Sequence, residues 1–237
     1  MKITIVSHYY NHHEEVNRQI KHWESMKGFS NKEIEVILID DFSEKVYEPP
    51  TSRINIRHIR IDKDIPWNQG GCRNLGAYLA RGEWLLIFDI DQYLNPNALA
   101  IISQNLSQLD KNTLHYLKCK PIYNSVDNVT ADFHPNSYLV NTDTFRRIGM
   151  YDEDFCGHYG YEDLFLPIAW ERNGGKRTLL GGVDFFDADL PFETSNLDRD
   201  LEYNKQLSSQ KLMRLQNLEP KTLWRPEGIL RFSWHEL

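Results

Sequence analysis

The chain has 237 residues, 41% of them hydrophobic and 26% charged, which suits one large domain with a sizeable buried core. Its formal net charge of −7 disfavours a nucleic-acid-binding protein, because such proteins normally carry a basic surplus. The three cysteines form no CxxC pair, the N-terminal segment turns polar too soon for a signal peptide, and no run of about 18 apolar residues occurs. We therefore expect a reduced, cytoplasmic setting and no transmembrane segment.

The first half of the sequence alternates strand and helix patterns. Short apolar runs typical of buried strands are followed by apolar residues at helical spacing, as at Val16, Ile20 and Trp23. This order predicts an α/β fold, with a mostly parallel sheet and helices on both faces, in which ligands bind at the carboxyl ends of strands. The expected strands are 3–7, 34–39, 54–61 and 84–88, and the later helices are 68–80 and a segment from Asn95-Pro96 to Leu109.

The second half is less regular. Its tail, residues 224–237, mixes Trp, Arg and Phe. We favour packing of this tail on the domain, with contact to a partner or to a membrane surface as the alternatives. The expected strands are 114–122, 137–140, 177–180 and 183–186, and the expected helices are 142–148, 161–172 and 200–218.

An apolar strand at 84–88 leads directly into Asp89-Ile90-Asp91. Residues two apart on an extended segment point the same way, so both carboxylates can face one spot beyond the strand end. Two such acids repel each other unless a cation lies between them, and a hard divalent ion binds carboxylate and phosphate oxygens together. The pattern favours a metal and phosphate site over a strand-end turn with two solvated acids.

A glycine-rich segment, residues 68–77, carries Arg73 near the start of a predicted helix. Glycines permit close backbone approach, and a helix N-terminus attracts anions. A cation in the first turn opposes the helix dipole, which indicates that Arg73 serves a diphosphate or a nearby carboxylate. The alternative is a plain glycine-rich turn with a surface arginine.

Two acids, Asp40 and Asp41, end the second predicted strand and precede Phe42-Ser43. Acids at this place can accept hydrogen bonds from the N–H group of a base or from ribose hydroxyls. An Asx turn explains the same pattern equally well.

A further acidic pair, Glu162-Asp163, follows the small and aromatic residues 157–161 at the start of a predicted helix. Acids at a helix N-terminus compensate the dipole, which is one explanation of the pair. The other is a carboxylate that deprotonates an acceptor hydroxyl, beside aromatic rings that offer a flat face to a sugar.

Taken together, these motifs resemble the inverting family 2 glycosyltransferases of the GT-A fold and their galactosyl- and N-acetylgalactosaminyltransferase relatives. The resemblance implies a Rossmann-like three-layer sandwich with a mixed, mostly parallel central sheet, in a single domain over residues 1–237. It implies a nucleotide-binding half at 1–110, an acceptor-binding half at 111–199, and a C-terminal helix and tail at 200–237. The matching pieces are TIVS at 4–7, ILIDDFS at 37–43, GGCRNLG at 70–76, FDID at 88–91 and GYED at 160–163.

The same resemblance implies transfer of a sugar from a nucleotide-diphospho-sugar, most often UDP-linked, to a hydroxyl of a glycan or glycoconjugate. Mn²⁺ or Mg²⁺ would be the cofactor, and polysaccharide biosynthesis the setting, in the cytoplasm or at the inner face of the membrane. Asp163 would be the base, Glu162 would hold the acceptor, and Asp91, with Asp89 beside it, would bind the metal. The residues implied for the nucleotide are Ser7, His8, Tyr9, Asp40 or Asp41, Arg73 and Asp89.

One departure from the family pattern concerns the metal. Many relatives place a His after the Glu-Asp motif as another ligand, whereas residues 184–193 contain none. Asp187 or Asp189 would substitute for it, or phosphates and water would complete the shell. The histidines elsewhere are expected to be surface or structural residues, namely His12, His13, His22, His58 and His134.

Two alternatives remain for the function. A phosphatase of the haloacid dehalogenase type also places two acids after an apolar strand, with Asp89 as nucleophile and Asp91 as acid. The following Gln92-Tyr93, and the position of the motif after three strands, fit that family poorly. The second alternative is a non-catalytic nucleotide-sugar-binding protein.

Overall fold

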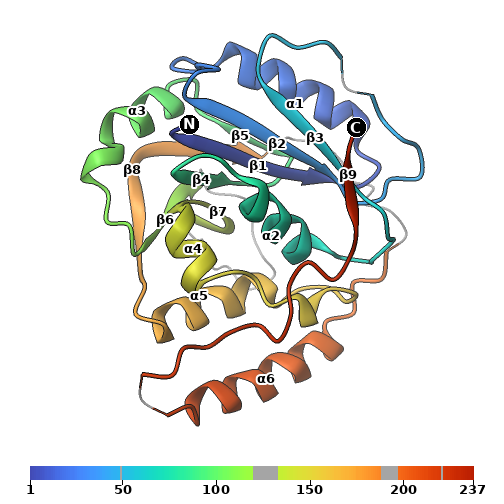
Figure 1. The fold of residues 1–237 in the computed structure, drawn as a ribbon, viewed down its shortest axis with the longest axis vertical. Coiled ribbons are helices and arrows are strands. Elements are labelled where there is room, and N and C mark those ends of the chain that lie inside the picture. The colour runs from blue at the N-terminus through green and yellow to red at the C-terminus, as the bar shows by residue number, and fades with distance from the viewer. Residues whose placement is uncertain (49, 120–132, 188–196, 220) are drawn as a thin grey trace.

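A computed structural model describes residues 1–48, 50–119, 133–187, 197–219 and 221–237 of the chain. Its first half alternates strands and helices as the apolar spacing predicts (Figure 1). The elements of this half are β1 (Ile3–Tyr9), α1 (His13–Ser25), β2 (Ile34–Asp40), β3 (Ile56–Ile61), α2 (Gln69–Leu79), β4 (Trp84–Ile87), β5 (Gln92–Leu94), α3 (Ala98–Asn105) and the 3₁₀ turn η1 (Leu106–Gln108).

The second half places its elements close to the predicted ranges. Helix α4 begins where predicted, since the Asn141 side chain accepts a hydrogen bond from the backbone N–H of Thr144 and so caps it. The elements are β6 (Thr113–Cys119), β7 (Phe133–Asn141), α4 (Thr142–Ile148), the 3₁₀ turn η2 (Glu153–Phe155), α5 (Glu162–Arg172), β8 (Lys176–Asp187), α6 (Glu202–Gln216) and β9 (Trp234–Glu236).

Two local predictions were wrong. The two short strands expected at 177–180 and 183–186 form one strand, β8, which pairs with β6 along one edge and with β5 along the other. Helix α3 begins at Ala98 rather than at Pro96, because Asn95 forms a turn instead of a cap. Its side-chain oxygen accepts from the N–H of Asn97 (3.1 Å), and its carbonyl accepts from the N–H of Ala98 (2.9 Å).

One nine-stranded sheet runs through the described residues, in the order β5-β8-β6-β7-β4-β1-β2-β3-β9. Strands β4, β1, β2 and β3 are parallel. Strand β7 is antiparallel to both β4 and β6, β6 and β8 are parallel, and β9 closes the far edge antiparallel to β3. The sheet is therefore mixed, and its continuous parallel part lies in the first half of the chain.

Helices cover both faces of this sheet, which makes three layers (Figure 1). Successive strand residues point to opposite faces, so each apolar strand contributes to two cores. Leu38 and Leu86 pack in the core that contains α1 and α3, whereas Ile39 and Ile87 pack in the core that contains α2, α4 and α5. The three-layer α/β architecture is confirmed.

The tail packs on the domain, as favoured from the sequence. Phe232 is buried in the core beside α2, and Trp224 packs with Phe165 and Leu215 between α5 and α6. Residues Trp234–Glu236 join the sheet as β9. Among the helices that the structure describes, none combines the length and apolar character needed to cross a bilayer.

Candidate functional site

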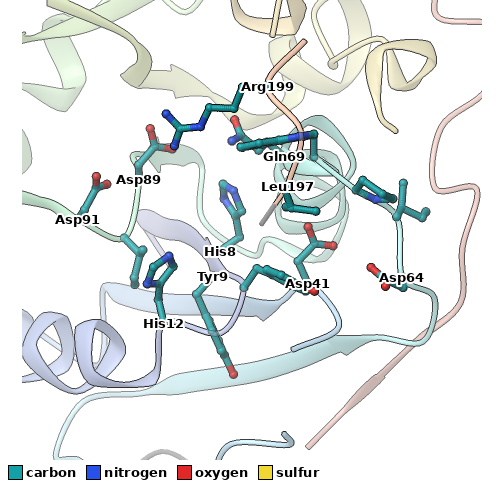
Figure 2. A pocket seen from close by; sticks show the side chains of 15 residues that line it. His8, Tyr9, His12, Asp41, Asp64, Gln69, Asp89, Asp91, Leu197 and Arg199 are labelled. Atoms are coloured by element: carbon teal, nitrogen blue, oxygen red, sulfur yellow. The ribbon is translucent and has the colours of Figure 1, made fainter. Parts of the chain in front are cut away.

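A pocket of about 380 Å³ opens beyond the carboxyl ends of β1, β2 and β4, the edge at which parallel sheets bind ligands. Its walls come from the three strand ends, from the loop between β3 and α2, and from residues 197 and 199. Figure 2 shows Asp89 and Asp91 at one end, Asp41 and Asp64 at the other, and His8 between them. The pocket is therefore elongated and carries carboxylates at both ends.

The two acids that end β2 have different environments. Asp40 is fully buried, forms an ion pair with Arg60, and accepts a hydrogen bond from the backbone N–H of Ser43 (2.8 Å). Asp41 lines the pocket and accepts a hydrogen bond from the Asn68 side chain (3.0 Å). Burial raises the pKa of Asp41 to about 7, although the bond from Asn68 opposes the shift. Asp40 shapes the turn, and Asp41 is the acid available to a ligand.

The three candidate residues at the end of β1 also differ in whether they are available to a ligand. Ser7 is fully buried and is not among the lining residues. Tyr9 is among the residues that line the pocket, but its side chain packs in the core and its hydroxyl bonds the Nε2 of His58 on β3 at 2.8 Å. His8 faces the cavity, and burial, with Arg73 adding to it, lowers its pKa to about 4. His8 is therefore a neutral ring, with one donor and one acceptor for a ligand.

Arg73 serves a carboxylate, one of the two roles proposed for it above. It is only 1% exposed and is not among the lining residues, and its Nη2 lies 2.5 Å from Oδ1 of Asp89. Burial alone would raise the pKa of Asp89, but the charge of Arg73 lowers it overall. Asp89 is thus held as an ionised carboxylate, and Asp91 also lines the pocket.

The Glu162-Asp163 pair begins α5. Burial first, and then the charge of Asp163, raises the pKa of Glu162 to about 7. Burial also raises the pKa of Asp163, against the opposing influence of Arg73 and His134. Both acids interact electrostatically with Arg73 and Asp89. The structure therefore gathers the acids of two distant motifs around one arginine.

Helix α6 fixes the loop that leads into α5. The side-chain amide of Asn204, which is fully buried, donates to the carbonyls of Phe155 (3.0 Å), His158 (2.9 Å) and Gly160 (2.7 Å). About two turns further along α6, Lys211 follows on the same side of the helix. These three bonds hold the backbone immediately before Glu162.

Lys211 is the second tie between α6 and this loop. Its side chain is 3% exposed, and its Nζ lies 2.8 Å from Oδ2 of Asp152 and 2.7 Å from Oδ2 of Asp154. Removing the carboxylate partners of a buried cation strongly destabilises the folded protein. Removing the cation from buried carboxylates does the same. The loop before the acidic pair is thus held by side chains of α6 rather than by strand pairing.

A cluster that the sequence reasoning missed lies at the pocket wall, where Trp67 and Arg199 are lining residues. The Nε1 of Trp67 donates to the carbonyl of Asp198 (2.6 Å), and its ring lies 4.6 Å from that of Tyr159. The guanidinium carbon of Arg199 lies 5.8 Å from the Trp67 ring and 5.6 Å from the Tyr159 ring. Three segments far apart in the sequence meet here, so no local sequence pattern predicts the contact.

Two histidines expected to be surface or structural residues also lie at the site. His12 lines the pocket, and the Nδ1 of His134 on β7 lies 3.9 Å from Oδ2 of Asp89. A signal for His12 was available, since it follows the end of β1 by three residues. His134 had no such signal, because β7 enters the sheet from the second half of the chain.

For a divalent metal, the pocket offers carboxylate oxygens of the kind that hard cations bind. Among the described residues no group of three or more His, Cys, Asp and Glu side chains could hold an ion. Asp91 at the pocket wall fits an ion that a protein binds through one or two carboxylates while phosphate oxygens complete its shell. The substitute ligands named above, the side chain of Asp187 and all of Asp189, lie outside the described residues.

Comparison with known proteins gives a family and a fold. The sequence profile described as "Glycosyl transferase family 2" matches residues 4–158, well over half of the chain. A crystal structure of Staphylococcus aureus TarS residues 1–349 in complex with UDP-GlcNAc superposes with a TM-score of 0.63 at 16% identity, over 90% of this chain and 72% of that one. GalNAc-T7 with UDP, GalNAc and Mn²⁺ superposes with a TM-score of 0.59 at 14% identity, over 79% of this chain and 44% of that one.

No curated protein matches the chain in sequence. At the identities above, the structural likeness shows the fold, whereas the profile match shows the family. Both set aside the phosphatase alternative for Asp89 and Asp91, whose local strand-and-acid pattern is shared between unrelated families. The chain belongs to glycosyl transferase family 2, and it is a glycosyltransferase with the GT-A fold.

Proposed function

We propose that the chain transfers a sugar from a UDP-linked donor to a hydroxyl of a glycan or glycoconjugate, with inversion at the anomeric carbon. One observation carries the proposal: a single elongated pocket has Asp41 at one end and Asp89 and Asp91 at the other, and the negative charge of Asp89 acts on the Glu162-Asp163 pair. A nucleotide, its diphosphate and a sugar follow one another in the same linear order along a donor molecule. TarS and GalNAc-T7, which share the fold, were crystallised with UDP or a UDP-sugar.

The base and ribose occupy the Asp41 end in this proposal. Asp41 accepts the N–H of the base, and the lining rings of Tyr10 and Trp67 offer apolar faces against which the base can stack. Of the two candidates Asp40 and Asp41, the proposal keeps only Asp41, because Asp40 is occupied by Arg60 and Ser43. Ser7 and Arg73 are not proposed to contact the donor directly, because neither lines the pocket.

The diphosphate occupies the opposite end. Asp91 would hold Mn²⁺ or Mg²⁺, and when bound the ion would neutralise charge on the departing diphosphate. The chain's own contribution is the fixed Asp89, the neutral His8 and the guanidinium of Arg199, all of which line the pocket. In Figure 2 the Arg199 side chain points toward Asp89, from the rim opposite the strand ends. The guanidinium of Arg199 thereby supplies a positive charge for the diphosphate in a protein that is acidic overall.

Asp163 is the proposed base, and Glu162 the proposed acceptor-binding residue. A carboxylate whose pKa is raised by burial accepts a proton more readily than a solvated one. Asp163 takes the proton of the acceptor hydroxyl while that oxygen forms the new bond to the anomeric carbon, and the bond to the diphosphate breaks on the opposite face. One displacement inverts the anomeric centre and requires no covalent enzyme intermediate.

Two measurements test the proposal in sequence. A thermal-shift screen of nucleotides and nucleotide-sugars with and without Mn²⁺ should show a rise in the melting temperature with UDP-linked ligands, because ligands stabilise the folded state by mass action. NMR of the product formed on a model glycan acceptor should then show the anomeric configuration opposite to that of the donor. Retention of configuration, or preference for an unrelated nucleotide, would refute the corresponding part.

A further inference from the structure

Gln19 is a polar side chain on the apolar face of α1. Val16 and Ile20 beside it pack in the core, and Gln19 is itself fully buried. A buried amide has lost its contacts with water, so it needs hydrogen-bond partners within the protein. The Nε2 of Gln19 donates to the backbone carbonyls of Ile90 (3.0 Å) and Gln92 (2.6 Å), just beyond the end of β4. The helix is thereby tied to the segment that carries the Asp-Ile-Asp motif.

Asp91 lies between these two carbonyls along the chain. Residues 89–92 form a β-turn rather than the extended segment expected from the sequence, because the N–H of Gln92 donates to the carbonyl of Asp89 (3.1 Å). Asp89 and Asp91 thus reach the pocket from one turn, and not through the alternation of side chains along a strand. Gln19 holds the peptide group that precedes Asp91 and the one that follows Gln92.

Gln92 holds the first acid of the turn. Its Oε1 accepts hydrogen bonds from the backbone N–H of Asp89 (3.2 Å) and from the hydroxyl of Ser137 on β7. Gln92 and Ser137 are both buried. Gln92 is therefore held from α1 through its carbonyl and from β7 through its side chain. Strand β4 brings the turn to the pocket, and the two glutamines fix its conformation.

The other polar atom of Gln19 indicates that this residue does not serve the stability of the core. Among the residues that the structure describes, its Oε1 is buried and has no hydrogen-bond partner. An unpaired buried acceptor costs free energy, whereas an apolar side chain of the same shape would avoid that cost. The glutamine is therefore explained by the turn that it holds, and not by its packing in α1.

We propose that Gln19 is a positioning residue of the donor site, which fixes the turn so that Asp91 presents its carboxylate to the pocket. The inference rests on the proposed function, in which Asp91 holds the cation that binds the diphosphate. Asp91 lines the pocket and Gln19 is not among the lining residues, so Gln19 acts through the turn and not on the donor. Loss of hydrogen bonds that orient a metal ligand typically weakens metal binding by about 10- to 100-fold.

The test measures the affinity for UDP by calorimetry, with and without Mn²⁺, in wild type and in Gln19→Met. Methionine has nearly the length of glutamine but donates no hydrogen bond. The increase in affinity that Mn²⁺ produces should be about tenfold smaller in Gln19→Met, whereas the affinity without the ion should stay within about threefold of wild type. An unchanged increase in Gln19→Met would overturn the inference.

Asn173→Leu is the matched control. Like Gln19, Asn173 donates its side-chain amide to two backbone carbonyls, those of Ile148 (2.7 Å) and Trp224 (3.0 Å), and it is not among the pocket residues. Both substitutions should lower the melting temperature, because each removes the donor from two carbonyls. Asn173→Leu should keep the full effect of Mn²⁺ on UDP affinity. An equal loss in the control would show that this effect follows general stability, and would contradict the positioning role.

The double substitution Gln19→Met with Asp91→Ala tests whether Gln19 acts through Asp91. If it does, adding Gln19→Met to Asp91→Ala should not reduce the effect of Mn²⁺ further, because both substitutions remove the same interaction. Additive losses would refute the inference. Should Gln19→Met fail to fold, Gln19→Asn keeps the amide but is one methylene shorter, so it cannot span both carbonyls. It should lose part of the effect of Mn²⁺, and a full effect in this variant would also refute the inference.

The single substitutions separate this inference from the proposed function. If Asp91→Ala keeps the full effect of Mn²⁺ on UDP affinity, the assignment of the cation to Asp91 is wrong, and the positioning role of Gln19 fails with it. If Asp91→Ala loses the effect but Gln19→Met keeps it, only the positioning role is wrong, and the proposed function stands.

Discussion

The two halves of the site are positioned by different physical means. The donor pocket lies at the ends of parallel strands, so regular hydrogen bonding of the central sheet places Asp41, Asp89 and Asp91. The Glu162-Asp163 pair follows an irregular loop, which Asn204 and Lys211 of α6 hold through side-chain contacts. The first half is built from backbone geometry that many sequences share. The second depends on a few particular side chains, and it should be easier to disrupt by single substitutions.

The largest expected effect lies in the second half. Asp163→Asn keeps the shape of the side chain but removes its ability to accept a proton, and it should lower the turnover number about a thousandfold or more. UDP affinity should change little, because Asp163 is not among the pocket residues. Steady-state kinetics and calorimetry on one preparation check both statements. Asp143→Asn, at a highly exposed acid on α4, is the control that should alter neither. Turnover near the wild-type rate would contradict the assignment.

The next effect concerns stability and tests the side-chain ties of the loop. Lys211→Met should lower the free energy of unfolding by about 3–5 kcal/mol, since it leaves the buried Asp152 and the nearby Asp154 without their shared cation. Lys205→Met on the same helix removes an exposed lysine and should change it by less than about 0.5 kcal/mol. Urea denaturation measures both. Equal effects of the two substitutions would show that the loop does not depend on Lys211.

What the sequence could predict follows the same division. Strand ends at Asp41 and Asp91 were found because apolar runs mark buried strands, and parallel sheets bind ligands where such strands end. The separation of Asp40 from Asp41 was not predictable, because it depends on Arg60, which lies one strand over. Arg199 and His134 reach the site only through tertiary contacts. Arg73 was recognised as unusual from the helix dipole, but its carboxylate partner lies 16 residues away.

A third prediction probes the strand-end half through pH. Burial raises the folded-state pKa of Asp41 to about 7, whereas an unfolded aspartate titrates near pH 3.9. The folded state therefore keeps a proton that the unfolded state releases, so this residue's contribution to stability is present at low pH and is lost as pH rises toward 7. Asp41→Asn has no titrating carboxyl at this position, so it does not lose this stability as the pH rises. Relative to wild type, its free energy of unfolding should rise by about 2 kcal/mol or more between pH 4 and pH 8.

Denaturation curves at several pH values check this third prediction. Other titrating acids, such as Glu162, are present in both proteins and cancel in the comparison. Asp64→Asn is the matched control, because Asp64 lines the same pocket but is exposed. A difference between Asp41→Asn and wild type that does not vary with pH would mean that Asp41 is ionised in the folded protein throughout this range.

The smallest expected effect separates the two acids after β4, and with them the two halves of the site. Asp91 lines the pocket beside Asp89, which the second-half cluster already engages through Arg73. If Asp91 holds a cation that bridges to the diphosphate, Mn²⁺ should increase the affinity of the wild-type protein for UDP. In Asp91→Ala this increase in affinity should be about tenfold smaller. UDP titrations with and without Mn²⁺ measure it, with Asp143→Ala as the control at an exposed acid far from the strand ends. An unchanged Mn²⁺ dependence in Asp91→Ala would mean that the ion is held elsewhere. The strand-end half would then bind the nucleotide but not the metal ion. Asp91 would belong to the nucleotide-binding half, whereas Asp89 would belong with Arg73 to the second half.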